Sequence, residues 1–165
     1  LKNIDYHKSK RILPPAGEKE EIAVAYHLSI FVENKPGKLE SITKILAEQG
    51  INIYGIYIAS AGEFGVVKII ADRLAEAYQL LKDEGFTVSK RKVSIVLLPD
   101  RPGEMHKLLT LLARHQINLD DCYGFVLEAK SQAALVLEAE KHSLLEEVLQ
   151  ANHYQLLSEA KLSKG

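Results

Sequence analysis

The 165-residue sequence is poor in several residue types that mark particular classes of protein. Its one cysteine, Cys122, cannot form an internal disulfide, and a lone thiol is typical of a reducing compartment. No apolar run approaches the roughly 20 residues that span a bilayer. The first residues also lack the apolar core of a secretion signal. We therefore expect a cytoplasmic protein with no membrane partner.

An excess of charge of one sign is also lacking, because 21 Lys and Arg face 22 Asp and Glu, giving a formal net charge of −1. Overall charge therefore gives no reason to expect a nucleic-acid partner. The six histidines show no HxH or HxxxH spacing, so no metal site is predicted. No nucleophile, base and orienting group can be placed together, so we predict no enzyme activity, no catalytic residue and no cofactor.

The sequence does contain an internal repeat. The segment NKPGKLESITKILAEQGINI (34–53) returns as DRPGEMHKLLTLLARHQINL (100–119), with Pro36 matching Pro102 at an offset of 66. Further on the offset becomes 68, as expected if a hairpin has gained two residues. A unit of this length has the size of a small domain. We predict an N-terminal tail or linker followed by two tandem domains, with boundaries at 1–23, 24–92 and 93–165.

Each repeat predicts the element order βαββαβ. Alternating apolar residues indicate strands, and apolar residues spaced three or four apart indicate helices. Right-handed crossovers then place both helices on one face of a four-stranded antiparallel sheet. The predicted fold class is α+β, with two tandem ferredoxin-like units. The predicted strands are 24–33, 51–60, 64–71 and 86–91, then 93–98, 117–128, 132–138 and 154–159; the second-unit helices are 103–115 and 141–151.

The sheet face opposite the helices needs a second layer. Apolar residues that we assign to it, Ile56, Ile58 and Val126, would be covered by the other repeat, by a second chain, or by both. No turn signal separates the two repeats, because FTVSKRKVSIVLL (86–98) is strand-like throughout. We therefore predict one continuous or sharply bent strand between the sheets, and a homodimer.

The Pro-Gly turn that opens the first helix of each repeat is a candidate ligand site. The backbone N–H groups of residues 37–39 have no acceptor inside the helix, and the helix dipole favours an anion there. Gly37 lets a ligand approach the backbone, while Asn34 and Asn52 offer donors and acceptors for a free amino acid. The alternative is structural, since Asn34 and Asp100 are good turn residues and Pro-Gly is common before a helix.

Other polar and aromatic residues have competing interpretations. Tyr57 and Tyr123 match at the offset of 66, and we favour packing between sheets over a role in capping a ligand. His27 could line an interface, but a structural histidine is the favoured interpretation. Asp120 and Asp121 could bind a cation or accept an ammonium, and the alternative, slightly favoured, is an exposed kink in the strand. RNA-binding sheets carry exposed aromatic residues on their central strands. Here Ile30, Val67, Ile69 and Val96 occupy those strands, so no nucleic-acid partner is predicted.

The segment LSIFVENKPGKLESITKILAEQGINI closely resembles the start of an ACT domain, a small ligand-sensing module of amino-acid metabolism. Residues 23–161 resemble the stand-alone tandem ACT proteins. The resemblance implies amino-acid binding at interfaces between ACT modules. The implied site is similar to the serine site of phosphoglycerate dehydrogenase. The two asparagines of that site correspond to Asn34 and Asn52 in this chain. That enzyme also uses a histidine at the position where this chain has Val32. The difference argues against serine as the ligand.

The sequence thus predicts a non-catalytic regulatory protein that binds a free amino acid or related small metabolite. A partner enzyme or regulator would read the bound state, and the sequence does not name it. The alternative is a structural or protein-interaction module with non-functional ligand sites. The predicted ligand-binding residues are Asn34, Gly37, Lys38, Leu39, Asn52 and Ile53 in the first repeat and Asp100, Gly103, Glu104, Met105, Asn118 and Leu119 in the second.

Overall fold

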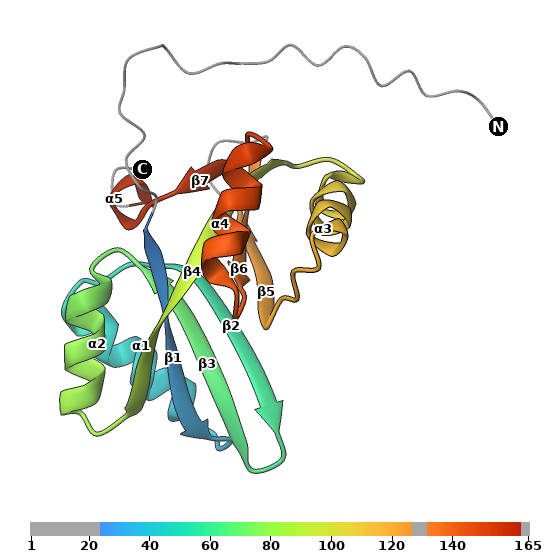
Figure 1. The fold of residues 1–165 in the computed structure, drawn as a ribbon. Coiled ribbons are helices and arrows are strands. Elements are labelled where there is room, and N and C mark those ends of the chain that lie inside the picture. The colour runs from blue at the N-terminus through green and yellow to red at the C-terminus, as the bar shows by residue number, and fades with distance from the viewer. Residues whose placement is uncertain (1–23, 127–131, 163–165) are drawn as a thin grey trace.

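The computed structural model describes residues 24–126 and 132–162, so the predicted N-terminal tail 1–23 lies outside the described residues. The element order βαββαβ occurs twice, as predicted, with one strand shared between the two units (Figure 1). The elements are β1 (Ala25–Glu33), α1 (Lys38–Glu48), β2 (Ile53–Ala61), β3 (Phe64–Ala71), α2 (Leu74–Asp83), β4 (Thr87–Pro99), α3 (Glu104–Arg114), β5 (Asp121–Val126), β6 (Gln132–Glu138), α4 (His142–Ala151), β7 (Gln155–Leu157) and α5 (Glu159–Leu162).

The shared strand is β4, which runs without interruption for 13 residues. Its first part, 87–93, pairs with β1, while its second part pairs with β6 through 94–99 and with β7 through 95–97. The strand orders are therefore β2-β3-β1-β4 in the first unit and β5-β6-β4-β7 in the second. The prediction of one continuous strand is confirmed, and the basic residues 90–92 do not end it.

Each unit has its own core between its helices and its sheet. Strand alternation in β1 directs Leu28 and Ile30 toward the helices, where they pack with Ile42 and Leu46 of α1. In the second unit Val96 and Leu98 of β4 pack with residues of α3 and α4 in the same way. Burying these apolar faces is the main term that holds each pair of helices on its sheet.

A third core joins the two units through the sheet faces opposite the helices. Phe125 of the second unit packs so close to Gly55 of the first that a Cβ at Gly55 would lie 3.1 Å from its ring. Glycine therefore permits the close approach of β2 and β5. The buried residues of this inter-unit core are Ala25, Ile70, Val93, Ile95, Leu97, Tyr123, Ala134, Val136, Leu157 and Leu162.

The assignment of Ile56 and Ile58 to this face is wrong. They pair with Ile69 and Val67, which belong to the helix-side core, and they are 44% and 49% exposed. The cause is a β-bulge between Ile53 and Gly55, because one extra residue inverts the alternation of side chains beyond it. The side chain of Val126 lies outside the described part of the chain.

Several predicted boundaries differ from the structure. The segment predicted as a strand from 117 starts only at Asp121, since the backbone N–H of Ile117 still bonds to Leu112 O at 3.0 Å in the turn after α3. Residues 127–128 of that predicted strand are not among those described. The last predicted strand, 154–159, is shorter because the short helix α5 begins at Glu159, with a bond from Leu162 N–H to Ser158 O at 3.2 Å. None of the helices in the described ranges has the length and apolar character needed to cross a bilayer.

Candidate functional site

The two Pro-Gly turns have the same backbone conformation. Gly37 precedes α1 with φ 88° and ψ −17°, and Gly103 precedes α3 with φ 91° and ψ −16°. A residue with a Cβ is strained in this left-handed region. A Cβ at either position would meet no atom of the described residues within 4 Å, so both turns are open on this side. We refer to residues 34–39 as the first turn site and to 100–105 as the second turn site.

Backbone donors at the turn sites are engaged only in part. The first bond of the α-helical pattern runs from Ser41 N–H to Gly37 O at 2.9 Å, and its counterpart runs from Lys107 N–H to Gly103 O at 3.0 Å. The N–H of Lys38 bonds to Lys35 O at 3.3 Å, so it is not fully free for a ligand as the sequence suggested. The donors of residues 37 and 39 precede the helical bonding pattern, which is the usual setting for an anion.

Asn34 has a structural role in the first turn site. Its backbone N–H donates to Glu63 O at 2.7 Å, and its side-chain Nδ2 donates to Gly62 O at 3.1 Å. These bonds tie the end of β1 to the hairpin between β2 and β3. Asp100 holds the matching place in the second turn site. A carboxylate has no N–H to donate, so the two turn sites differ in chemistry despite their common backbone.

Asn52 lies at the opposite end of the sheet from Asn34. Its backbone bonds to Asp72 in both directions, with N–H to Oδ1 and O to N each at 3.1 Å. Both β1 and β2 are antiparallel to β3, so they run in the same direction. Asn34 follows the end of β1, whereas Asn52 precedes the start of β2. At about 3.3 Å per strand residue the two are roughly 25 Å apart, so one unit cannot bring both to one ligand.

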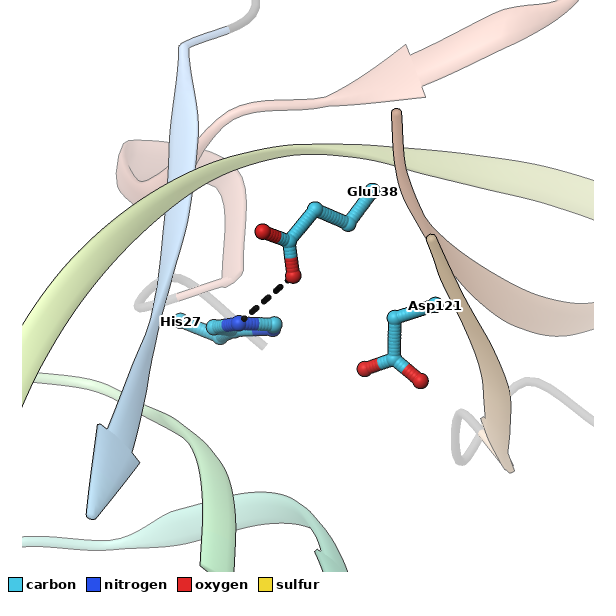
Figure 2. A group of neighbouring side chains, drawn as sticks. All are labelled: His27, Asp121 and Glu138. Carbon is cyan, nitrogen blue, oxygen red and sulfur yellow. Dashed lines mark ion pairs between the residues drawn. The ribbon is translucent and has the colours of Figure 1, made fainter. Parts of the chain in front are cut away.

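A polar cluster that the sequence did not reveal lies at the contact between the units (Figure 2). It gathers side chains from five strands: His27 from β1, Lys68 from β3, Arg91 from β4, Asp121 from β5 and Glu138 from β6. The only sequence signal is that His27 and Lys68 each stand between apolar residues of a strand. That signal gives no hint that they share partners in the other unit.

Lys68 provides the central cation of the cluster. Its Nζ lies 2.6 Å from Asp121 Oδ2 and 3.3 Å from Glu138 Oε2, and Arg91 Nε donates to Glu138 Oε1 at 2.7 Å. Ligand atoms of His27, Asp121 and Glu138 all lie within 4.8 Å of one another, a grouping that could suit a metal ion. Because the ammonium of Lys68 already contacts both carboxylates, we interpret the cluster as an ionic bridge between the units.

His27 is neutral in this environment. Burial, with the charge of Lys68, lowers the pKa of the imidazole to about 4, although Glu138 and Asp121 oppose the shift. Burial also raises the pKa of Tyr123, so its hydroxyl keeps its proton and can donate to His27 Nδ1, 3.1 Å away. Nε2–H then faces Glu138 Oε2 at 3.4 Å. The ring has no exposed surface, so it is closed to a ligand.

The comparisons agree with this architecture. Residues 23–165 match the protein family described as an ACT domain pair. The chain belongs to this family. The resemblance and the fold class predicted from the sequence are therefore confirmed.

Solved structures share the fold of this ACT pair. Protein BT0572 from Bacteroides thetaiotaomicron is 32% identical with a TM-score of 0.80, over 87% of this chain and 98% of that one. The ligand-free regulatory subunit of aspartate kinase from Thermus thermophilus is 15% identical with a TM-score of 0.58, over 78% and 92% of the two chains. At that identity the likeness is one of fold. The chain has no significant match among curated protein sequences.

The aromatic residues of the ACT pair separate into two groups. Tyr57 and Tyr123 stack with ring centroids 5.6 Å apart and an interplanar angle of 12°, which confirms the packing interpretation. Phe31 and Phe64 instead stack on the exposed surface of the central strands β1 and β3, 5.2 Å apart. The premise that these strands carry no exposed aromatic residue is therefore wrong. Ile30 of β1 faces the helices, whereas its neighbour Phe31 faces away from them.

Proposed function

We propose that this ACT pair is a non-catalytic regulatory protein that binds a free amino acid or a related small metabolite between two copies of the chain. The observation that carries the proposal is the left-handed glycine that opens both α1 and α3 onto free space. Such a turn leaves backbone donors and the positive end of a helix dipole available to a carboxylate.

A second copy supplies the group that one unit cannot bring to the turn. Strand β2 is at the outer end of the sheet order, so one of its edges has no partner strand among the described residues. Antiparallel pairing of two β2 edges would bring the start of one strand toward the end of the other. Asn52 of one copy would then approach the first turn site of its partner. Exposed Ile56 and Ile58 on this strand would be buried by the same pairing.

The proposed roles follow from the chemistry of an amino acid. Its carboxylate would lie on the backbone donors of Gly37 and Leu39, and its ammonium on the amide oxygens of Asn34 and of the partner's Asn52. Lys38 and Ile53 would complete the surroundings. In the second unit residues 100–105 and 118–119 hold the same places, and Asp100 would favour an ammonium over a carboxylate. The two sites would therefore select ligands differently.

Regulation would arise by linkage. A ligand that contacts both copies stabilises their pairing by its differential affinity for the paired state. A partner enzyme or regulator would read that pairing.

Three further properties are part of the proposal. The protein is a homodimer, and its location is cytoplasmic, which the lone Cys122 supports. The chain divides into domains at 24–92 and 93–165.

One observation favours a second candidate function, an interaction module with non-functional ligand sites. The side chain of Asn34 already donates to Gly62 O at 3.1 Å, which explains the residue without any ligand. In that case the turns would serve only to order the ends of β1 and the hairpin after β2.

A thermal-shift screen against the twenty common amino acids, followed by calorimetry on the best one, separates the two candidates. A ligand at 100 times its Kd adds about 2.7 kcal/mol to stability. We expect a positive shift that disappears in Asn34→Ala and Gly37→Ala. Gly85→Ala is the matched control, because Gly85 has φ 84° and equally open space. A screen with no shift would favour the interaction module.

A further inference from the structure

The end of the first sheet's non-helical face that carries Phe31 and Phe64 is not covered by the rest of the described chain. Phe31 pairs with Val66 of β3 and Thr87 of β4, so their side chains share this face. Phe31 is 50% exposed and Phe64 is 45% exposed, and their rings stack with an interplanar angle of 16°. We refer to the surface around Phe31, Phe64, Val66, Thr87 and Ser29 as the phenylalanine face.

The same face of the second unit is buried. By the repeat, Phe31 corresponds to Leu97 at the offset of 66 and Val66 to Ala134 at the offset of 68. Leu97 is 9% exposed and Ala134 is fully buried, since both belong to the inter-unit core. The molecule therefore covers one ACT sheet face with another. The lower ends of β1, β2 and β3 extend past the second unit, so no other part of the chain that the structure describes covers the phenylalanine face (Figure 1).

The charges around the phenylalanine face suit a copy of itself. Glu33 pairs with Lys35 at 2.9 Å and with Lys38 at 3.4 Å, so the rim carries both signs. An apolar centre with a charged rim is the usual anatomy of a protein interface. A hollow of about 250 Å³ beside Phe64 is bordered by Glu33, Lys35 and Glu63, so its lining also carries both signs of charge.

We propose that the phenylalanine face packs against the same face of a second copy in an isologous contact. The contact is continuous with the contact between the units. Along β1, His27 and Ser29 lie between Ala25 of the inter-unit core and Phe31, and along β3, Lys68 and Val66 lie between Ile70 of that core and Phe64. His27 and Lys68 themselves contact the second unit through the ionic bridge. A two-fold axis through the face would place the acidic and basic rim residues of one copy opposite those of the other. The contact is separate from the edge of β2 and needs no ligand.

The mass of the protein in solution, measured by light scattering without any amino acid, tests this contact. We expect Phe31→Ser/Phe64→Ser to halve the mass while the far-UV circular dichroism stays unchanged, because both side chains are exposed. A wild-type protein that is monomeric, or a double variant that keeps the wild-type mass, would overturn the proposal.

A second double variant distinguishes this contact from the pairing of β2 edges. Ile56→Lys/Ile58→Lys places charges on the edge strand and leaves the phenylalanine face intact. If only the isoleucine variant loses mass, the edge contact forms and the phenylalanine contact is wrong. If only the phenylalanine variant loses mass, the phenylalanine contact stands and the edge contact does not form without a ligand. If each variant halves the mass, both contacts exist and the wild-type assembly is a tetramer, made of two of the proposed homodimers.

Site-specific cross-linking gives an independent readout. In a Cys122→Ala background, Thr87→Cys on the phenylalanine face should be cross-linked into dimers by a short bismaleimide, whereas Glu40→Cys on α1 should not. Equal cross-linking at both positions would contradict the proposal. A labelled single-stranded oligonucleotide is the remaining control. Binding that is lost in Phe31→Ser/Phe64→Ser would assign the face to nucleic acid instead of a second copy.

Discussion

The two units of this ACT pair have the same order of elements and the same glycine conformation at their turns, yet they bury their sheets differently. The second unit is covered on both sides, by its helices and by the first unit. The first unit is covered on its non-helical side from Ala25 and Ile70 as far as His27 and Lys68, and Phe31 beyond them is half exposed. The difference shows that position in the chain, and not the fold of the unit, decides which surfaces stay free for partners.

The shared strand β4 makes the units unequal and also makes them dependent on each other. Residues 87–93 complete the first sheet, and residues 94–99 form the centre of the second. Loss of order in either unit would remove a strand partner from the other. We therefore expect the described part of the chain to unfold as one cooperative body.

The largest expected effect comes from matched cavities in the two cores. Leu46 and Leu112 occupy the same place in the repeat, and are 0% and 2% exposed. Leu46→Ala and Leu112→Ala should each cost about 3 to 4 kcal/mol of unfolding free energy. Urea denaturation should show a single transition for each protein. The midpoint of that transition should be lower in both variants than in the wild type.

Two separate transitions would contradict this expectation. If Leu46→Ala shifted only one of them and Leu112→Ala only the other, the units would be independent domains divided near residues 92 and 93. The fluorescence of tyrosines in the two units can be compared with circular dichroism to detect such a separation.

A smaller effect is expected at the ionic bridge between the units. Lys68→Met leaves Asp121 and Glu138 with no ammonium partner, and should cost about 2 to 3 kcal/mol of unfolding free energy, since Lys68 is 17% exposed and partly screened. Lys35→Met removes an ammonium from an exposed ion pair with Glu33, and should change stability by less than about 0.5 kcal/mol. Equal losses would show that the bridge does not hold the units together.

The pH dependence of stability reports the same contact. The unfolded state binds a proton at His27 with a pKa near 6.5, whereas the folded state binds it only near 4. Unfolding is therefore favoured as pH falls through this window, by at most about 1.4 kcal/mol per pH unit. Urea titrations between pH 7 and 5 should show this loss, and His27→Gln should reduce its slope.

The control for that measurement is His142, whose pKa burial also lowers. A residual slope in His27→Gln that disappears in His27→Gln/His142→Gln would agree with the account. An unchanged slope in His27→Gln would show that the folded protein binds the proton at His27 as readily as the unfolded chain does.

The smallest expected effect concerns the turns themselves. Gly37→Ala and Gly103→Ala meet no steric obstacle, so each should cost only the left-handed strain, about 1 kcal/mol. Thermal unfolding should show equal losses in both variants because the dihedral angles agree within a few degrees. A much larger loss in one variant would reveal that its turn has contacts that the other lacks.

The repeat, the element order and the continuous strand could all be predicted from the sequence, because they depend on local patterns of apolar residues. The face of Ile56 could not, since a bulge at the start of β2 inverts the alternation and leaves no sequence signal. The side chains that contact His27 and Lys68 could not be predicted from the sequence either. They come from the other unit, and pairwise contacts between distant strands are not encoded in any one segment.

The turn sites combine features that could be predicted from the sequence with one that could not. Their helix starts and their open glycines follow from Pro-Gly in the sequence. The separation of Asn34 from Asn52 does not, because it depends on β1 and β2 running in the same direction. That topology converts a site expected within one unit into a site that needs two copies.

The most direct test of this account is a mixing experiment with Asn34→Ala and Asn52→Ala. Each variant alone should fail to bind the amino acid that gives the largest thermal shift, as measured by calorimetry. A mixed dimer retains one complete site, so an equimolar mixture should recover about one quarter of the wild-type binding capacity. No recovery in the mixture, or undiminished binding by Asn52→Ala alone, would contradict a ligand site shared between two copies.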